Sequence, residues 1–341
     1  MRKTIVYILV LGILGFGVWY FLFSDKQLFS ADEAGFKINN IEAIHRIYLA
    51  NQSGQHISVT RTEDGWMVND MYKARPGMID LLLETLKQQE AAYPAPENAH
   101  NNIIKGLAGN GIKVELYNKN NDPIRIFYVG GQVAGSAGTY MLIEGAKRPY
   151  VVQLPVFQGY VTPRYSVEME DWRDRTVMNI PASELEKVSV EYPTEELNNF
   201  TLQQDAEGTL SVSVHPELMK DKQLNEKRAK DYSGFFEKVY CEGFLNGTLH
   251  IDSIIAGTQK NCTIEVLAKD GKKEHIDIYW MPITRRSKNM LTADPDVPDV
   301  YDADRLYAVF NNYKDTAIIQ RRTFGKLFRK GYEFYEQDTK Q

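Results

Sequence analysis

The sequence predicts an α+β fold: one N-terminal transmembrane helix followed by two tandem repeated modules of mainly antiparallel strands, each covered by a helix. Three observations lead to this prediction. An apolar run opens the chain at Ile5–Phe23, the second half repeats the hydrophobic pattern of the first, and each half holds one amphipathic stripe. The expected boundaries are 1–30 for a short cytoplasmic start, anchor and linker, 31–178 for the first module, and 179–341 for the second module and C-terminal tail.

The apolar run is long enough to cross a bilayer. Its nineteen uncharged residues reach ~28 Å as a helix at ~1.5 Å per residue, which matches one hydrocarbon core. Arg2 and Lys3 precede it and should stay cytoplasmic, whereas Trp19 and Tyr20 suit the opposite interface. The alternative is a cleaved signal peptide, whose apolar region is usually about 7 to 15 residues. We expect a single-pass protein of the inner membrane with its C-terminal bulk in the periplasm or cell exterior.

Composition and charge describe an ordinary globular protein. A length of 341 residues is too long for one ordinary core and fits about two domains. Without Arg2 and Lys3, 38 basic residues (40 − 2) face 45 acidic ones, a formal charge of 38 − 45 = −7. Nucleic-acid recognition needs a basic surface, so no nucleic-acid partner is expected.

The internal repeat is clearest where residues 139–161 align without a gap with residues 306–328. An apolar pair followed by glutamine keeps the same place in both copies. The matching positions are Tyr140 and Tyr307, Val151 and Ile318, Val152 and Ile319, Gln153 and Gln320, and Phe157 and Phe324.

A second ungapped alignment joins residues 112–129 to residues 264–281. Both copies alternate with period two, which is typical of a half-buried antiparallel hairpin. Polar turns are expected at Asn118–Asp122 and Asp270–Lys273. The aligned apolar positions are Ile112, Val114, Ile124 and Ile126 against Ile264, Val266, Ile276 and Ile278.

Each half also opens with two strands and contains a helical stripe. The first strands place Ile44, Ile47 and Leu49 against Leu185, Val188 and Val190. The second strands, 57–61 and 200–204, lead into the turns Asp64-Gly65 and Glu207-Gly208. The stripes follow the spacing i, i+3, i+4, i+7 and consist of Ile79, Leu82, Leu83 and Leu86 in the first half and Tyr232, Phe235, Phe236, Val239 and Tyr240 in the second.

Several motifs in this layout resemble a bacterial membrane-anchored family catalogued as domain of unknown function number 4340. They are Asp64-Gly65-Trp66 closing a hairpin, Arg75-Pro76 opening a helix, and Asp171-Trp172-Arg173-Asp174-Arg175 between the modules. Thr209 replaces the tryptophan of the first motif in the second half. The resemblance implies no activity. It implies a companion of membrane transport or gliding-motility components, which is an association rather than a mechanism.

Cys241 and Cys262 are the only cysteines. An exported position would allow them to form a disulfide, which is worth roughly 3 kcal/mol in the chain-entropy model. Two buried thiols are the alternative, because sequence does not show whether the Cα atoms are close enough.

An acidic loop is the weak metal candidate. Asp294, Asp296 and Asp299 offer the oxygen ligands that calcium prefers. The EF-hand frame is broken, however, because Pro298 occupies its fifth position and Arg305 replaces the bidentate glutamate. A solvated acidic loop is the interpretation that we favour.

The junction carboxylates are the weak catalytic candidate. Glu168, Glu170, Asp171 and Asp174 contain enough acids for the pair that a glycoside hydrolase needs, but the alternation with arginine also describes a salt-bridged linker. The glycine-rich stretch Gly130–Gly138 lacks a phosphate-loop pattern and is expected to connect strands.

The six histidines show no metal-ligand spacing, and no G-x-S-x-G motif occurs. We therefore expect no catalytic residue, no cofactor and no resident metal. The leading hypothesis is a non-catalytic accessory, scaffold or binding protein of a membrane transport or gliding-type complex, attached to the membrane through Ile5–Phe23. The alternative is a glycan-binding or glycan-hydrolysing protein that uses acids near Glu170 or Asp299. A small-molecule ligand is left open.

Overall fold

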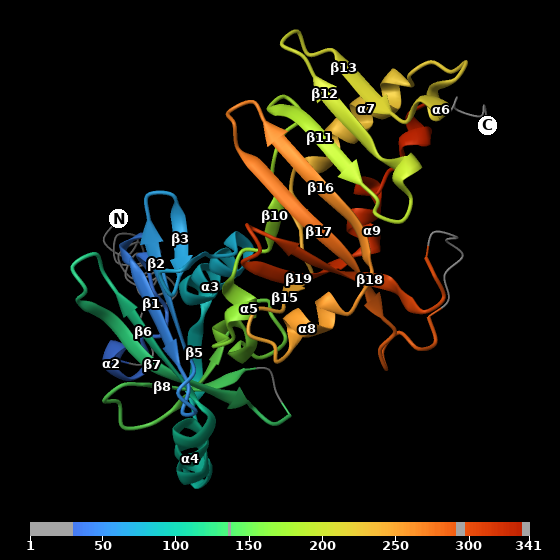
Figure 1. Cartoon of the computed structure of the whole chain (residues 1–341). Helices are drawn as coiled ribbons and strands as arrows, with labels where there is room; N and C mark the ends of the chain where they lie inside the picture. The colour runs from blue at the N-terminus through green and yellow to red at the C-terminus, as the bar shows by residue number, and fades with distance from the viewer. Residues whose placement is uncertain (1–29, 136–137, 291–296, 336–341) are drawn as a thin grey trace, which may run out of the picture. The chain divides into compact units, whose positions relative to one another are not determined.

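The computed structural model describes residues 30–135, 138–290 and 297–335. The chain forms two compact units, which divide in the sequence between Asp174 and Arg175. Each unit is built on one large antiparallel sheet (Figure 1). The predicted membrane segment Ile5–Phe23 lies outside the described residues. Within the part of the chain that the structure describes, no helix has the length and apolarity to cross a bilayer.

The first unit contains a nine-stranded sheet in the order β4-β3-β2-β1-β6-β7-β8-β9-β5. Period-two alternation gives it one buried face, on which β1 places Ile47 and Leu49. The strands are β1 (Arg46–Ala50), β2 (His56–Thr62), β3 (Gly65–Val68), β4 (Tyr72–Lys73), β5 (Glu90–Pro94), β6 (Ile112–Tyr117), β7 (Pro123–Gln132), β8 (Thr139–Ile143) and β9 (Tyr150–Gln153).

The helix α3 (Pro76–Gln88) covers the buried face of this sheet. Pro76 stands in its first turn, where a missing N–H leaves no helical bond unmade. Met78, Ile79, Leu82 and Leu86 follow helical spacing and are buried in the same cluster as the strand residues. The remaining helices of this face are short: α2 (Ala31–Ala34), α5 (Met169–Trp172), and the 3-10 turns η1 (Ile41–Ala43) and η3 (Thr162–Tyr165).

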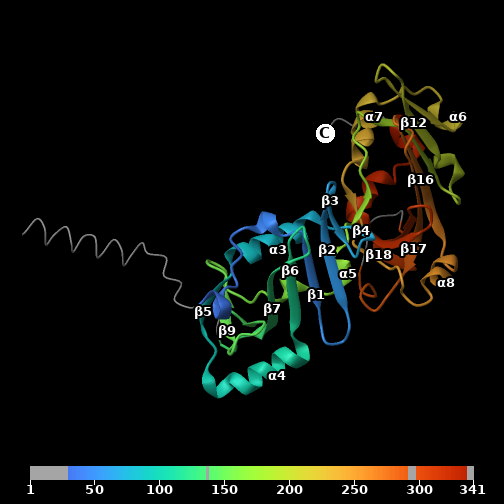
Figure 2. The same ribbon diagram turned by 90° about the vertical axis from the view of Figure 1, so that its left-hand side faces the viewer.

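The helix α4 (His100–Asn110) lies on the other side of the sheet from α3 (Figure 2). It follows the 3-10 turn η2 (Glu97–Ala99). Its Ile103 and Leu107 are buried against Tyr128, Tyr140 and Leu142, which the strands present on that face. The first unit is therefore a sheet with a main core on one face and a small apolar cluster on the other.

The second unit contains an eight-stranded sheet in the order β13-β12-β11-β16-β17-β18-β19-β15, and β10 pairs with β14 beside it. The strands are β10 (Thr176–Met178), β11 (Leu185–Glu191), β12 (Phe200–Gln204), β13 (Leu210–Val214), β14 (Val239–Tyr240), β15 (Gly243–Phe244), β16 (Lys260–Ala268), β17 (Lys273–Pro282), β18 (Tyr301–Phe310) and β19 (Asp315–Gln320).

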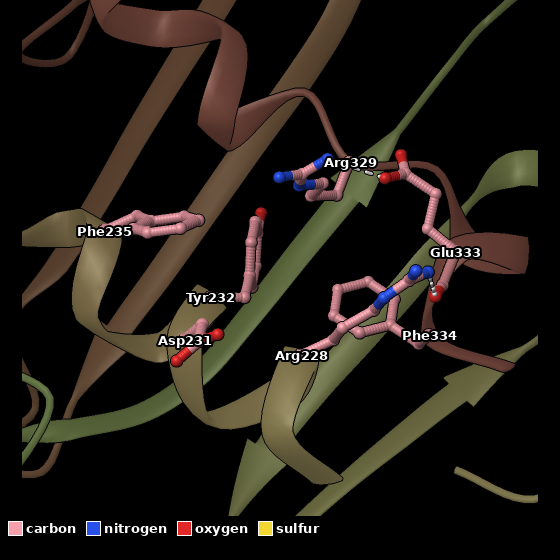
Figure 3. Close-up of a pocket in the computed structure, with 7 residues that line it drawn as sticks. All are labelled: Arg228, Asp231, Tyr232, Phe235, Arg329, Glu333 and Phe334. Carbon is pink, nitrogen blue, oxygen red and sulfur yellow. Dashed lines mark hydrogen bonds and ion pairs between the residues drawn. The ribbon is translucent and has the colours of Figure 1, made fainter. Parts of the chain in front are cut away.

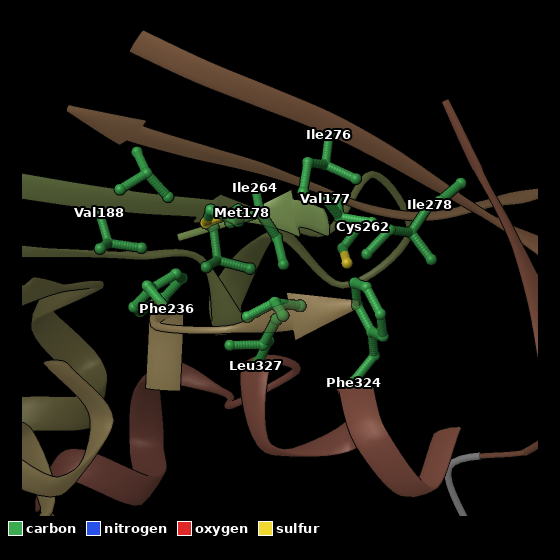
Figure 4. Close-up of a cluster of buried hydrophobic side chains, with 14 of the residues drawn as sticks. Val177, Met178, Val188, Phe236, Cys262, Ile264, Ile276, Ile278, Phe324 and Leu327 are labelled. Carbon is green, nitrogen blue, oxygen red and sulfur yellow. The ribbon is translucent and has the colours of Figure 1, made fainter. Parts of the chain in front are cut away.

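Short helices cover both faces of the second sheet. On the main core side, Phe324 and Leu327 join the same cluster as Ile264 and Cys262 of β16 (Figure 4). On the other face, the helix α8 packs against Met281 and Tyr307. The helices are α6 (Pro216–Met219), α7 (Glu226–Ser233), α8 (Ile251–Ala256) and α9 (Arg321–Phe324), with the 3-10 turns η4 (Glu196–Asn198), η5 (Gly234–Phe236), η6 (Gly325–Leu327) and η7 (Gly331–Tyr335).

The two sheets have the same strand order once the edge strand β4 is set aside. The sequence β3-β2-β1-β6-β7-β8-β9-β5 of the first corresponds member by member to β13-β12-β11-β16-β17-β18-β19-β15 of the second. The helices occur at corresponding points too, because α3 and α7 precede β5 and β15, while α4 and α8 precede the hairpins β6–β7 and β16–β17. The two units are therefore two copies of one topology.

The pairing register confirms the alignment of 139–161 with 306–328. Thr139 pairs with Val152, and Leu306 pairs with Ile319. Both partners are displaced by the same number of residues, since 306 − 139 = 319 − 152 = 167. The alignments of the opening strands are confirmed in the same way, by the pairs Ile47–Val59 and Val188–Leu202 and the pairs Leu49–Ile57 and Val190–Phe200.

The second ungapped alignment is wrong in register, although both hairpins form. Val114 pairs with Phe127 in the first unit, and Ile264 pairs with Ile276 in the second. Val114 also pairs with Leu49, and Ile264 with Val190, so Val114 corresponds to Ile264 and the predicted alignment is shifted by two residues on the first strand. A bulge at Ile124 adds one more residue on β7, so Ile276 corresponds to Phe127 rather than to Ile124. Because a shift of one residue exchanges the two faces of a strand, an ungapped alignment cannot follow both strands of this hairpin.

The predicted fold class is wrong: the described chain consists mostly of antiparallel sheets with few helices. Among the described helices, only α3 and α4 are longer than eight residues. The second predicted stripe fails as a helix because α7 ends at Ser233, Gly234 begins a 3-10 turn, and Val239 and Tyr240 form β14. Aromatic and β-branched residues suit strands better than helices, and here Val239 and Tyr240 lie in strand β14.

Candidate functional site

The chain leaves each sheet after the hairpins β8–β9 and β18–β19 and returns across its core face. In the second unit this segment forms α9, η6 and η7. Phe324, Leu327 and Phe334 are buried, which holds the segment against the sheet. Arg322 precedes the first anchor, Lys326 and Arg329 lie between the anchors, and all three are exposed. The spacing of the apolar residues thus turns a row of cations toward solvent.

A groove of about 760 Å³ runs beside this segment. Its other wall comes from the ends of β11, β16, β17 and β18. Five basic residues line it, namely Arg321, Arg322, Lys326, Arg329 and Lys330, against the three acids Glu195, Asp304 and Glu333. The lining is therefore positive in a chain whose formal net charge is −5.

The acids of the groove already have basic partners. Glu195 lies 2.8 Å from Lys330 Nζ, Glu333 lies 2.7 Å from Arg329 Nη1, and Asp304 lies 2.7 Å from Arg286 Nη2. For Arg322 and Lys326, the described residues offer no acidic side chain within ion-pair distance. Lys326 Nζ instead lies 5.2 Å from the centre of the Phe235 ring. The unbalanced charge of the groove resides on these two side chains.

One aromatic residue, Trp280, lines the groove and stacks on Tyr301. The rings of Trp280 and Tyr301 stack with centroids 5.4 Å apart and planes inclined by 15°. Arg321 Cζ lies 5.6 Å from the Trp280 ring centre, a cation–π distance. Both aromatic residues are well covered, and Trp280 is 5% exposed. The stacking of Tyr301 holds the Trp280 ring in place beside Arg321.

A smaller pocket of about 280 Å³ adjoins the groove (Figure 3). It lies between α7 and η7 and shares Arg329 and Glu333 with the groove. Arg228 Nη1 donates to the Glu333 carbonyl oxygen at 2.7 Å, and the Tyr232 hydroxyl donates to the Leu327 carbonyl oxygen at 3.1 Å. These two hydrogen bonds connect α7 to η6 and η7 and so help to fix the wall of the groove that those turns form.

The corresponding segment of the first unit lacks this charge. The confirmed displacement of 167 residues places Leu154, Pro155 and Gly159 opposite Arg321, Arg322 and Lys326. Trp280 pairs with Leu306, and the counterpart of Leu306, Thr139, pairs with Gln132, so a glutamine stands where the second unit has tryptophan. The shared topology therefore does not require the basic and aromatic residues of the groove.

A second polar cluster lies on the opposite face of the second sheet. The Asp277 carboxylate, 3% exposed, accepts from Thr263 Oγ1 at 2.7 Å, and lies 2.9 Å from Lys260 Nζ and 3.3 Å from His275 Nε2. Burial opposes the charge of Lys260, but the bond to Asp277 outweighs it and raises the pKa of the lysine. The contacts of Asp277 with Thr263 and Lys260 join side chains of β17 to side chains of β16.

The sequence-predicted cysteines are both buried, and no disulfide joins Cys241 to Cys262. Cys262 lies in the core of the second unit (Figure 4), where burial raises the pKa of its thiol. A thiol in such surroundings is inert. The disulfide that the sequence allows is therefore not formed in the structure.

The weak metal candidates do not form a site among the described residues. Asp294 and Asp296 lie outside them, and Asp299 is exposed in a turn. Nearby Asp302 is buried and accepts from the backbone N–H groups of Asp304 and Arg305. No group of three or more histidine, cysteine, aspartate or glutamate side chains suited to a metal occurs in the described part of the chain.

The junction carboxylates serve local structure. Asp171 accepts from Ser166 Oγ at 2.5 Å, and Glu168 accepts from Gln55 Nε2 at 3.1 Å. Trp172, which follows Asp171, is fully buried and donates its indole N–H to the Ser166 carbonyl oxygen. The glycine-rich stretch around Gly131 ends β7 and leads to β8, as an inter-strand connection. Glu170 is exposed.

No family model, curated protein or solved structure matches this chain. The resemblance to the family of unknown function stays a prediction on the residues that carry it. Sequence reasoning missed the groove. The signal that was available is the run 321–332, in which five basic residues occur without an acidic one.

Proposed function

We propose that this chain is a non-catalytic binding protein of the bacterial cell envelope, attached to a membrane through Ile5–Phe23, whose second unit binds an acidic segment of a partner protein. The partner class is the one that the family resemblance implies, a component of a membrane transport or gliding-type complex. The basic groove carries the proposal, because its cations are positioned by buried neighbours and have no counterpart in the first unit.

The chemistry of the groove favours carboxylates as the ligand groups. Lys330 and Arg329 already pair with carboxylates of this chain at 2.8 and 2.7 Å. Arg322 and Lys326 present further donors along the same wall. Guanidinium and ammonium groups bind carboxylates by charge-assisted hydrogen bonds, which are stronger than neutral ones. An acidic peptide segment laid along this wall would satisfy the two side chains that lack acidic partners.

The test uses the full chain in detergent and a fluorescein-labelled oligoglutamate peptide, followed by fluorescence anisotropy. Wild-type protein should bind the peptide, and salt should weaken the binding because the charges are exposed. The double variant Arg322→Glu and Lys326→Glu should weaken binding by about tenfold or more, equivalent to ~1.4 kcal/mol.

The matched control reverses two exposed lysines of the same unit outside the groove, Lys187→Glu and Lys269→Glu. This variant has the same net charge as the groove variant and should bind like the wild type. Equal weakening by both double variants would attribute binding to overall charge and contradict the proposal. In-cell crosslinking with the two variants would then identify which natural partner depends on the groove.

A further inference from the structure

The loop that follows β9 in the first unit exposes apolar side chains. Within Pro155–Tyr160, Val156 is fully exposed, Phe157 is 39% exposed and Tyr160 is 40% exposed. We call residues 155–160 the apolar tip. Scattered exposed apolar residues are ordinary on a protein surface, but three within five positions of one loop are a local patch.

The backbone of the apolar tip is strained. Val156 has φ of 66°, in the left-handed region that β-branched residues rarely occupy. Strain of this kind persists only where the surrounding structure enforces it, and it concentrates at sites with a function. Here it aims the valine side chain away from the protein rather than into the core.

Neighbouring residues hold the tip in this form. Arg164 Cζ lies 4.6 Å from the Phe157 ring centre, and Arg164 Nη1 donates to Thr85 Oγ1 of α3 at 2.9 Å. A Cβ atom at Gly159 would lie 2.8 Å from Cε1 of Phe157, so any larger residue there would displace the ring. The tip is anchored at its base and exposed at its apex.

The second copy shows that the fold does not require an exposed tip. Phe324 is the counterpart of Phe157 and is fully buried. Its segment forms the helix α9, whereas Val156 in the first copy, the counterpart of Thr323 in α9, has a left-handed backbone that a right-handed helix does not allow. The segment after β19 is thus a helix that packs into the core, whereas the segment after β9 is a loop that exposes apolar side chains.

The apolar tip lies beside the N-terminal part of the described chain. Val156 and Pro155 line a hollow of about 430 Å³ together with Lys37 and Lys87. Both lysines are exposed, and the described residues offer neither of them an acidic side chain at ion-pair distance. Only six residues, 24–29, lie between the predicted membrane run, ending at Phe23, and Ser30, and the seven steps from Phe23 to Ser30 span at most about 25 Å.

We propose that the apolar tip inserts into the headgroup region of the membrane to which the chain is attached. Valine, phenylalanine and tyrosine suit the boundary between acyl chains and headgroups, and Lys37 and Lys87 complement anionic lipid headgroups. This inference rests on the membrane attachment stated under the proposed function. The insertion adds a second contact and fixes the orientation of the first unit on the bilayer.

The experiment places an environment-sensitive nitrobenzoxadiazole label on the tip of the full chain, reconstituted in vesicles of phosphatidylcholine and phosphatidylglycerol. Val156→Cys supplies the site, and labelling is selective because both native cysteines are buried. Tyr160→Cys is a second tip site that leaves Val156 intact. Met71→Cys, an exposed position between β3 and β4, is the control.

The labels at positions 156 and 160 should emit at shorter wavelength than the label at position 71 in the same vesicles, and doxyl-labelled lipids should quench them. The label at position 71 should emit as in water and escape quenching. Flotation of the vesicles with the protein tests the attachment separately. Absence of flotation overturns both attachment and insertion, whereas flotation with tip labels that behave like the control overturns the insertion alone.

Discussion

The two copies of the fold agree in their sheets and differ in the segment that follows the last long hairpin. The pairing of β8 with β9 has the same register as that of β18 with β19. Beyond it, Phe157 is exposed in the first unit while its counterpart Phe324 is fully buried in the second. Register is held by the buried face of the sheet, whereas a connection at the surface varies freely. The two sheets thus share one topology, whereas the segments that follow β9 and β19 expose different side chains.

The largest expected difference concerns the two aromatic counterparts. Phe324→Ala should lower the free energy of unfolding of the second unit by about 3–5 kcal/mol, because it empties a buried aromatic site. Phe157→Ala should lower that of the first unit by about 1 kcal/mol or less, because its ring contacts mainly Arg164. Urea unfolding followed by peptide-resolved hydrogen exchange assigns each change to its unit. Equal losses at both positions would contradict the comparison.

An intermediate effect is expected at the polar cluster of the second sheet. Asp277→Asn should lower the free energy of unfolding of the second unit at neutral pH by about 1–3 kcal/mol, because Lys260 loses its charged partner. In the first unit the corresponding position is Tyr128, since Asp277 pairs with Val309 and Tyr128 with Leu142. Tyr128→Phe is therefore the matched control, and a loss as large as that of Asp277→Asn would contradict the assignment.

The same carboxylate makes the second unit sensitive to acid. Burial would raise the pKa of Asp277, but hydrogen bonds from Thr263 and Lys260 outweigh burial and hold the pKa below its usual value. Its stabilisation is therefore complete above the unfolded pKa of about 3.9 and is lost as pH falls through the folded value. Unfolding measured against pH should show a steeper acid limb for wild type than for Asp277→Asn. Parallel acid limbs would contradict this cause.

The smallest effect is expected in the groove. Arg322→Ala with Lys326→Ala should change the free energy of unfolding by no more than about 0.5 kcal/mol, because both side chains are exposed and lack acidic partners among the described residues. Lys187→Ala with Lys269→Ala is the matched pair outside the groove. A loss well above that of the matched pair, in urea unfolding, would mean that the groove cations stabilise the fold rather than serve a ligand.

Sequence reasoning recovered those strand pairs in which apolar positions alternate without interruption. The alignments through Thr139 and Leu306, and through Ile47 and Val188, give the same registers as the observed pairing. It failed at the bulge at Ile124, because one inserted residue exchanges the faces of a strand without changing its composition. It also failed at the helix expected across Tyr232–Tyr240, where Gly234 ends the regular helix and the last residues join a strand.

The candidate site was less predictable than the fold. Its basic residues occupy one run, but Trp280, Tyr301 and Glu195 join them from three other parts of the chain. The acidic candidates predicted from sequence, Glu170 and Asp299, are exposed and do not line the groove. Local composition marks where charge is concentrated, whereas a groove also needs a facing wall that only long-range strand pairing supplies.

By itself, the sequence determined that one topology occurs twice, because hydrophobic period and turn chemistry are local properties that each copy repeats. Tertiary structure decided what each copy presents to its surroundings. Phe157 stays exposed in the first unit, whereas Phe324 is buried in the core cluster of the second, against residues that are far away in sequence. Because a core is closely packed, Phe324 fits into the second core while Phe157 remains outside the first. The basic groove therefore lies on the second unit and the apolar tip on the first.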